Sequence, residues 1–175
     1  MLKGGDPRNN YDVLGAAIRN RLNHNQYGIK RILIVDDSKD FAHGIKEFLH
    51  KHTGIHTEST IRTNRAIAVL RMAVEHGRPF QVVISDMQMG LKNDDGLTFL
   101  GKVKRQYPEI RTILMSSTVD TTFQPCESAD FRLHKDTHDM LTHLLLLIDR
   151  LAARVERVNH QPMVEGPIEE LRHHA

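Results

Sequence analysis

At 175 residues the chain is long enough for one domain with a sizeable core and short terminal extensions. Its 24 basic and 22 acidic side chains nearly balance, so the composition gives no reason to expect a nucleic-acid partner. A single cysteine, Cys126, excludes an internal disulfide, and the lack of a signal-peptide core or of a bilayer-length apolar run predicts a cytoplasmic protein with no membrane contact.

The first half of the chain alternates between helical periodicity and short β-branched runs. Residues 1–10 are polar and glycine-rich, and we expect them to be disordered. Apolar residues at helical spacing predict a helix over residues 11–24, and residues 23–28 have the composition of a linker. The elements expected next are a strand at 31–36, a helix at 38–51, a strand at 55–59 and a helix at 63–76.

The second half continues the alternation. The expected elements are a strand at 82–86, a turn-rich loop at 90–96, a helix at 97–106, strands at 110–116 and 131–134, and a long helix from about residue 137. Alternating strands and helices predict an α/β fold with a doubly wound, five-stranded parallel sheet. We therefore expect a domain at 30–150, an N-terminal extension with a short helix at 1–29, and an extended last helix with a tail at 151–175.

Carboxylates follow two of the expected buried strands. Asp36 and Asp37 end the apolar run of residues 32–35, and Asp86 ends the run of residues 82–85. In open α/β sheets the ligand site lies beyond the carboxyl ends of the strands, so these acids should meet in one crevice. Like charges at close range require a cation or a raised pKa, and oxygen ligands favour Mg²⁺.

Two further polar residues stand at predicted strand ends. Ser117 follows the strand at 110–116, and Lys135 follows the strand at 131–134. Any one strand-terminal Asp is more often a turn or a helix cap than a nucleophile. All five residues in this order suit phosphoryl transfer to a carboxylate, with a hydroxyl and an ammonium holding the transferred group.

The segments ILIVDDS, VVISDM and ILMSST, together with Lys135, resemble the receiver domain of two-component response regulators. The resemblance covers residues 31–150 and implies a flavodoxin-like fold with Asp86 as the phosphoacceptor. It also implies the magnesium ligands: Asp37 and Asp86 directly, Asp36 through water, and the main-chain carbonyl of Gln88. By the same resemblance Ser117 is the switch hydroxyl and Lys135 contacts the phosphoryl group.

The chain departs from the family beside the expected switch. Thr118 is bulkier than the usual Ala or Gly and could narrow access to the site. Val119, like Gln88, stands at a position that tunes hydrolysis in the family. Arg132 replaces the usual aromatic residue three places before the lysine, and Phe131 stands one place early, so we expect these two side chains to point to opposite faces of the strand.

Two other departures affect loops. Gly90 stands where the family usually has a proline, and the Asp94–Asp95–Gly96 turn arrives about two residues late, so the extra acid is expected to serve a solvated turn rather than the metal. The segment between the expected switch and the lysine is short and contains Pro125, so we expect the fourth helix of the family to be truncated or replaced by a loop.

The last helix carries an apolar stripe with heptad spacing. Its first half has the alternative explanation that the helix must pack on the sheet. We favour dimerisation through the stripe, with a monomer whose two terminal helices cover each other as the alternative. The predicted dimerisation residues are Leu144, Ile148, Leu151, Val155 and Val158.

These features predict a stand-alone phosphoacceptor with Mg²⁺ as cofactor and no enzymatic activity beyond self-phosphorylation and self-dephosphorylation. Its expected partners are a histidine kinase or histidine phosphotransfer protein, a protein effector and a second copy of the chain. One alternative is a receiver-like dimeric interaction module that phosphorylation does not control. A second, a magnesium-dependent phosphatase, requires an acid two residues after the nucleophile, where this chain has Gln88.

Overall fold

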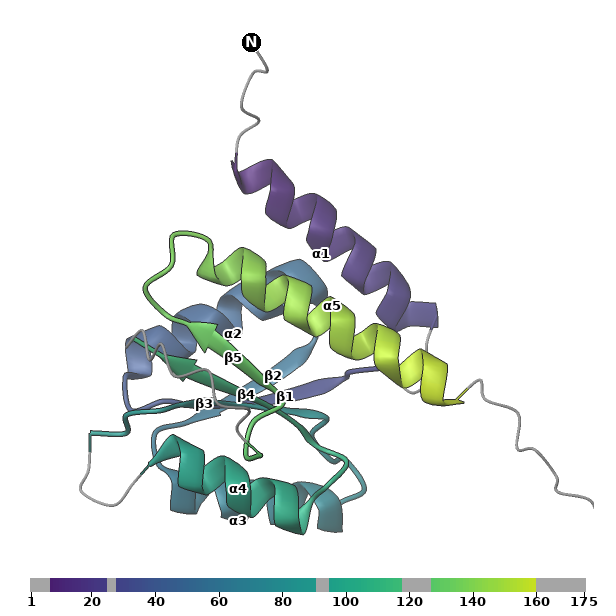
Figure 1. The fold of residues 1–175 in the computed structure, drawn as a ribbon. Helices are drawn as coiled ribbons and strands as arrows, with labels where there is room; N and C mark the ends of the chain where they lie inside the picture. Colours follow the sequence, from purple (N-terminus) through teal and green to yellow (C-terminus); the bar gives the residue numbers. More distant parts are fainter. Residues whose placement is uncertain (1–6, 25–27, 91–94, 118–126, 160–175) are drawn as a thin grey trace, which may run out of the picture.

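The computed structural model describes residues 7–24, 28–90, 95–117 and 127–159, with the side chains of 7–10, 21–24 and 153–159 excepted. This part of the chain contains five helices and five strands, and their arrangement is drawn in Figure 1. In chain order they are α1 (Pro7–His24), β1 (Arg31–Val35), α2 (Lys39–Thr53), β2 (His56–Thr60), α3 (Thr63–Glu75), β3 (Val82–Asp86), α4 (Gly96–Gln106), β4 (Arg111–Ser116), β5 (Phe131–His134) and α5 (Met140–Asn159).

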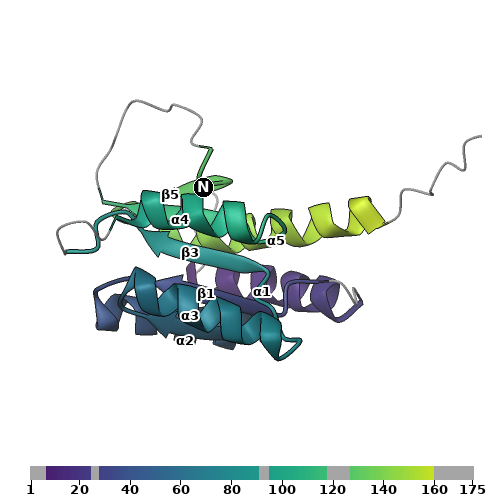
Figure 2. The same ribbon diagram turned by 90° about the horizontal axis from the view of Figure 1, so that it is seen from below.

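The five strands form one parallel sheet in the order β2-β1-β3-β4-β5. Helices α2 and α5 cover one face of the sheet, and α3 and α4 cover the other (Figures 1 and 2). Helix α1 lies outside α2 and α5 and packs on both. The predicted doubly wound, five-stranded parallel sheet is confirmed.

Both faces of the sheet are buried, which explains why the central strands read as continuous apolar runs. Because successive side chains of a strand point to opposite faces, Ile32 and Ile34 of β1 join the core under α2 and α5. Leu33 and Val35 of the same strand join the second core, under α3 and α4. This sandwiching holds the ends of the central strands in register.

Helix α1 begins earlier than the sequence pattern predicted. It starts at Pro7, so the expectation of disorder is wrong for residues 7–10, while residues 1–6 lie outside the described chain. Proline is well suited to a first helical turn because its missing N–H would have no intrahelical acceptor there.

The contact between α1 and α2 is specific. Ile18 is fully buried, and the ring of Tyr11 meets the ring of Phe48 edge-on, with centroids 5.4 Å apart. The guanidinium of Arg19 donates to the main-chain carbonyl of His52, near the end of α2. Carbonyls in the last turn of a helix lack intrahelical donors, so α1 caps α2 as well as covering it.

The heptad stripe of α5 is explained by packing within the chain. Leu144 and Ile148 are fully buried and Leu151 is 1% exposed, all three in the core that also contains Ile18 of α1. The structure therefore corrects their predicted dimerisation role, because these side chains leave no surface for a second copy. The side chains of Val155 and Val158 lie outside the described residues, so dimerisation through them stays a prediction.

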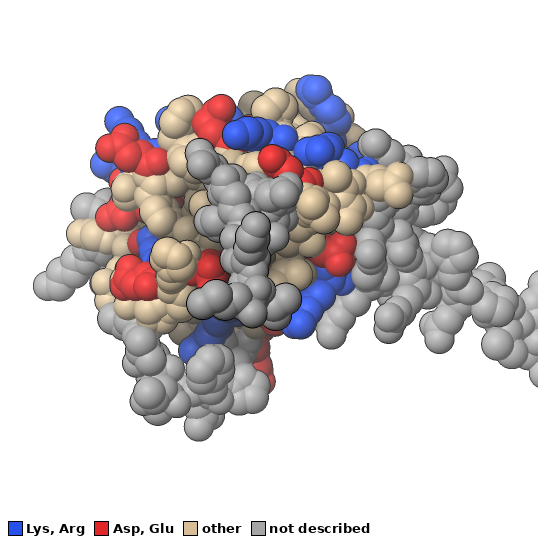
Figure 3. Space-filling model, turned by 90° about the horizontal axis from the view of Figure 1, so that it is seen from above, with Lys and Arg blue, Asp and Glu red and all other residues tan. Residues whose placement is uncertain are grey.

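The surface carries both charge signs. Figure 3 shows Lys and Arg side chains interspersed with Asp and Glu side chains on the face seen from above. This distribution agrees with the net charge of +2. Within the described residues, no helix combines the length and apolar character needed to cross a bilayer.

The connection between β4 and β5 is anchored by Asp130. Residues 127–130 form turns and a bend, whereas the expected truncation around Pro125 lies outside the described residues. The Asp130 carboxylate accepts hydrogen bonds from Lys104 Nζ at 2.6 Å and from the Thr112 main-chain N–H at 2.8 Å. Burial raises the pKa of Asp130, but these hydrogen bonds outweigh burial and hold the pKa below its ordinary value of 3.8.

Replacing Asp130 with Asn is expected to lower the free energy of unfolding by about 2 kcal/mol at neutral pH, because charge-assisted hydrogen bonds are lost. A carboxyl group with a lowered folded pKa stabilises the fold above its unfolded pKa, and this stability is lost as the pH falls through the folded pKa. Denaturant titrations of both proteins at neutral and acidic pH should show the difference shrinking in acid. A pH-independent difference, or an equal loss in Asp139→Asn at an exposed position, would contradict this role.

Candidate phosphoacceptor and metal site

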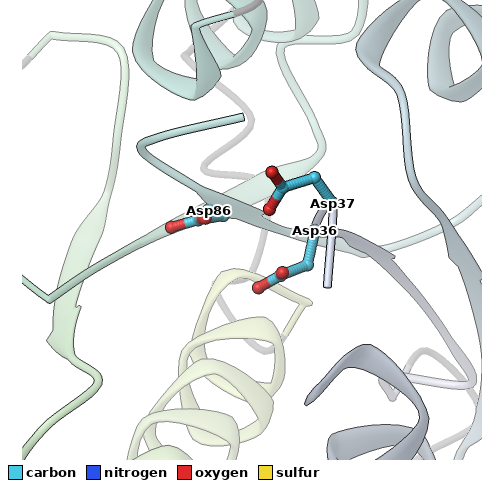
Figure 4. Close-up of side chains that lie close together, drawn as sticks. All are labelled: Asp36, Asp37 and Asp86. Carbon is cyan, nitrogen blue, oxygen red and sulfur yellow. The ribbon is translucent and has the colours of Figure 1, made fainter. Parts of the chain in front are cut away.

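The register of the two central strands brings three carboxylates together. Strands β1 and β3 are parallel neighbours, with Val35 paired to Ser85, so Asp36 lies beside Asp86. Asp37 follows directly and completes the cluster in Figure 4. One carboxylate oxygen from each residue lies within 4.8 Å of the other two. The structure thus brings the three predicted acids together at one edge of the sheet.

Lys135 extends into this cluster from the end of β5. Its Nζ lies 2.8 Å from Asp36 Oδ2 and 3.0 Å from Asp86 Oδ1, and its side chain is only 12% exposed. Its main-chain N–H donates to the carbonyl of Ser116, which ties the end of β5 to β4. The ammonium also lies 4.5 Å from the ring centroid of Phe41 in α2. This lysine therefore bridges two of the three carboxylates.

Asp36 is held in place from two sides. It is fully buried, and its Oδ1 accepts a hydrogen bond from the Ser38 main-chain N–H while its Oδ2 accepts from Lys135. Burial raises the pKa of Asp36, and the hydrogen bonds from Lys135 and Ser38 offset only part of that increase. A site that destabilises a carboxylate in this way favours an added cation.

The other predicted residues lie around this cluster. Ser117 follows β4 and is exposed, whereas Thr118 and Val119 lie outside the described residues. Arg132 is half-buried in β5. Phe131 packs on the core under α2 and α5, as Leu133 does, which places Arg132 on the opposite face by strand alternation.

The loop from β3 to α4 is closed at its base. Gln88 is exposed and forms an antiparallel bridge with Asp95, and the Gly96 N–H donates to the carbonyl of Met87. The Asp95 carboxylate accepts from the N–H groups of Leu97 and Thr98, so it caps α4 and does not join the acidic cluster. The expectation that this segment serves a turn and not the metal is confirmed for Asp95. Asp94 lies outside the described residues.

Gly96 must be a glycine because α4 begins directly against the end of β3. A Cβ at this position would lie 1.7 Å from the Asp86 carbonyl oxygen, which no side chain could tolerate. Sequence reasoning did not identify this contact, nor the contact of Phe41 with Lys135. The only sequence signal was the Asp-Gly pair, since Phe41 also fits the apolar face of α2.

The donor set fits Mg²⁺. Three carboxylates supply hard oxygen ligands at one edge of the sheet, and Lys135 is the one cation paired with them among the described residues. Magnesium is commonly bound through one or two carboxylates and several waters, which suits an exposed Asp37 beside a buried Asp86.

A comparison with protein families identifies the family of this chain. Residues 32–132 match the family described as "Response regulator receiver domain". The chain belongs to the response regulator receiver family. The matched range contains all three carboxylates, and the resemblance read from the sequence is confirmed. This family is that of two-component signal transduction, in which receiver domains act as phosphoacceptors.

Solved receiver structures share the fold of this chain. The signal receiver domain of an HD domain-containing protein from Pseudomonas fluorescens is 20% identical, with a TM-score of 0.60 over 75% of this chain and 93% of that one. The response regulator TrrA from Thermotoga maritima, solved with Mg²⁺–BeF, is 20% identical, with a TM-score of 0.57 over 70% and 98%. The beryllofluoride-activated NtrC4 receiver domain dimer is 21% identical, with a TM-score of 0.58 over 72% and 98%. A comparison with curated proteins finds no match.

Proposed function

We propose that this receiver takes a phosphoryl group on Asp86 in a cytoplasmic His-Asp phosphorelay, from a histidine kinase or histidine phosphotransfer protein. The observation that carries the proposal is the position of Asp86. Its carboxylate lies beside two further carboxylates and 3.0 Å from the ammonium of Lys135. A nucleophile and a phosphate-binding cation are thus in contact before any donor arrives.

In the proposed reaction, a carboxylate oxygen of Asp86 attacks phosphorus in line as the bond from phosphorus to the donor's imidazole nitrogen breaks. An acyl phosphate forms on Asp86, and the donor histidine, which carries a proton on its other ring nitrogen, leaves as neutral imidazole. Asp37, Asp86 and the Gln88 carbonyl would hold Mg²⁺, with Asp36 assisting through water, and the ion would neutralise the phosphoryl oxygens.

Lys135 and Ser117 carry the response to the new group. Phosphorylation removes the negative charge of the Asp86 carboxylate and places a phosphoryl dianion farther out, so the Lys135 ammonium follows the phosphoryl oxygens. The hydroxyl of Ser117, which follows β4 directly, donates a hydrogen bond to the same group. The resulting shift of the loops at this edge is read by a protein partner.

The test is incubation of the full chain with Mg²⁺ and a small acyl phosphate, followed by intact mass measurement and size-exclusion chromatography. One phosphoryl adduct that requires Mg²⁺ supports the proposal. A protein that binds Mg²⁺ but forms no adduct, and whose oligomeric state never changes, would instead favour the interaction module that phosphorylation does not control.

Replacing Asp37 with Ala is expected to abolish Mg²⁺ binding at millimolar concentrations while preserving the fold. Asp37 is exposed and its removal relieves repulsion with two nearby carboxylates, so the melting temperature without Mg²⁺ should hold or rise slightly. Mg²⁺ titration followed by amide NMR shifts measures the affinity. Asp40→Asn, an exposed acid in the first turn of α2, is the control that should bind like the wild type. An unchanged titration in Asp37→Ala would refute the ligand assignment.

A further inference from the structure

The Asp37 carboxylate lies against Gly90, a glycine in the left-handed region. Gly90 has φ 62°, and a Cβ built on it would lie 2.4 Å from Asp37 Oδ2 and 3.6 Å from Asp37 Cγ. Real Cβ atoms do not approach other atoms this closely. The Asp37 carboxylate thus occupies the space that any side chain at position 90 would need.

Asp37 differs from its two neighbours in how it is held. The Lys135 ammonium fixes Asp36 and Asp86, but no hydrogen bond or ion pair to the Asp37 carboxylate is present among the described residues. The direction of this carboxylate therefore depends on the space around it, which the backbone at Gly90 limits on one side.

The backbone that leads into Gly90 is held in place. Gln88 forms a bridge with Asp95, and Met89, next to Gly90, is 2% exposed in the core under α3 and α4. A side chain at position 90 would consequently displace the Asp37 carboxylate, the end of a side chain, rather than the backbone at position 90. A proline there would also require φ near −65°, which this backbone does not have.

We propose that Gly90 is a positioning residue for magnesium: its missing side chain lets the Asp37 carboxylate turn toward Asp86 so that both can bind one ion. The proposal rests on the magnesium site of the proposed function. It assigns to Gly90 a role in metal affinity and none in contact with the phosphoryl group.

The test is Mg²⁺ affinity and thermal stability of Gly90→Ala in the full chain. We expect the Kd for Mg²⁺ to rise about tenfold or more, the range seen when groups that orient metal ligands are lost. Gly54→Ala and Gly77→Ala are matched controls, because both glycines have similar φ (72° and 66°) and nothing within 4 Å of an added Cβ. The controls should lose thermal stability from the same backbone strain and bind Mg²⁺ like the wild type.

Gly90→Asn gives a second readout, because Asn tolerates the left-handed conformation better than Ala yet still carries a Cβ. It should melt closer to the wild type and still bind Mg²⁺ weakly. In the Asp37→Ala background the carboxylate that an added Cβ would meet is absent. Without Mg²⁺, Gly90→Ala should then lower the melting temperature by no more than Gly54→Ala does. A wild-type Mg²⁺ affinity in Gly90→Ala or Gly90→Asn overturns the proposal.

The outcome for Gly90 can be separated from that for the proposed function. A wild type that binds Mg²⁺ with Gly90-dependent affinity but takes no phosphoryl group would overturn the phosphoacceptor role alone. A wild type that binds no Mg²⁺ would overturn both.

Discussion

Replacing Asp86 with Asn is expected to abolish the phosphoryl adduct formed with a small acyl phosphate and Mg²⁺. An amide at this position has no carboxylate oxygen to attack phosphorus, and it also removes one of the proposed metal ligands. Asp36 is a poor substitute because it is fully buried and accepts hydrogen bonds from both Ser38 and Lys135.

Intact mass followed by peptide mapping measures this effect, with borohydride reduction to mark the acyl phosphate. Asp40→Asn removes a charge near the site from outside the cluster and should form the adduct like the wild type. The amide at position 86 is nearly isosteric, so the fold should persist, as circular dichroism would verify. An adduct in Asp86→Asn that maps to Asp37 would show that the acceptor has been assigned to the wrong carboxylate.

Replacing Lys135 with Met is expected to lower the free energy of unfolding by about 3 kcal/mol at neutral pH, because it leaves buried carboxylates without their cation. The methionine keeps an apolar stem beside Phe41, so the measured loss of stability reports the removal of the charge and not of the packing. Burial already raises the pKa of Asp36, and removing the ammonium, whose hydrogen bond lowers that pKa, raises it further.

The pH dependence of this loss has a defined sign. A carboxyl group whose folded pKa is raised destabilises the fold as the pH rises from the unfolded pKa through the folded one. The loss of stability in Lys135→Met should therefore be small in acid, where the carboxyl groups are protonated, and complete at neutral pH, where they are charged. Millimolar Mg²⁺ should restore part of the lost stability.

Denaturant titrations measure the loss of stability, its dependence on pH and its recovery with Mg²⁺. Lys102→Met, at an exposed position, is the control. A loss that is unchanged by pH and by Mg²⁺ would show that Lys135 acts through packing.

Most of the fold could be predicted from local pattern. The strand at 82–86 has the bounds that its apolar run predicted, because a parallel strand buried on both faces must be largely apolar. The strand at 131–134 also has the predicted bounds, although this edge strand is only partly buried and carries Arg132 and His134. The start of α1 could not be read in this way, since residues 7–10 are polar and only the first-turn preference of Pro7 marks them.

The candidate site was predictable where its residues end strands. Asp36, Asp37 and Asp86 could be placed together because parallel strands bring their carboxyl ends to one edge. The contact of Gly90 with Asp37 could not be inferred, since it depends on the path of a loop fifty residues away along the chain. The contact of Phe41 with Lys135 could not be inferred either, because Phe41 also fits the apolar face that packs α2 on the sheet.

The sequence by itself determined the alternation of strands and helices and the order of the acids along them, because these follow from local periodicity and from strand ends. Tertiary structure alone decided what covers the stripe of Leu144, Ile148 and Leu151. A heptad of apolar residues satisfies a coiled coil and a helix packed on its own sheet equally well, since both bury one face of the helix. Here the sheet and α1 bury that face, so the stripe belongs to the core of the chain.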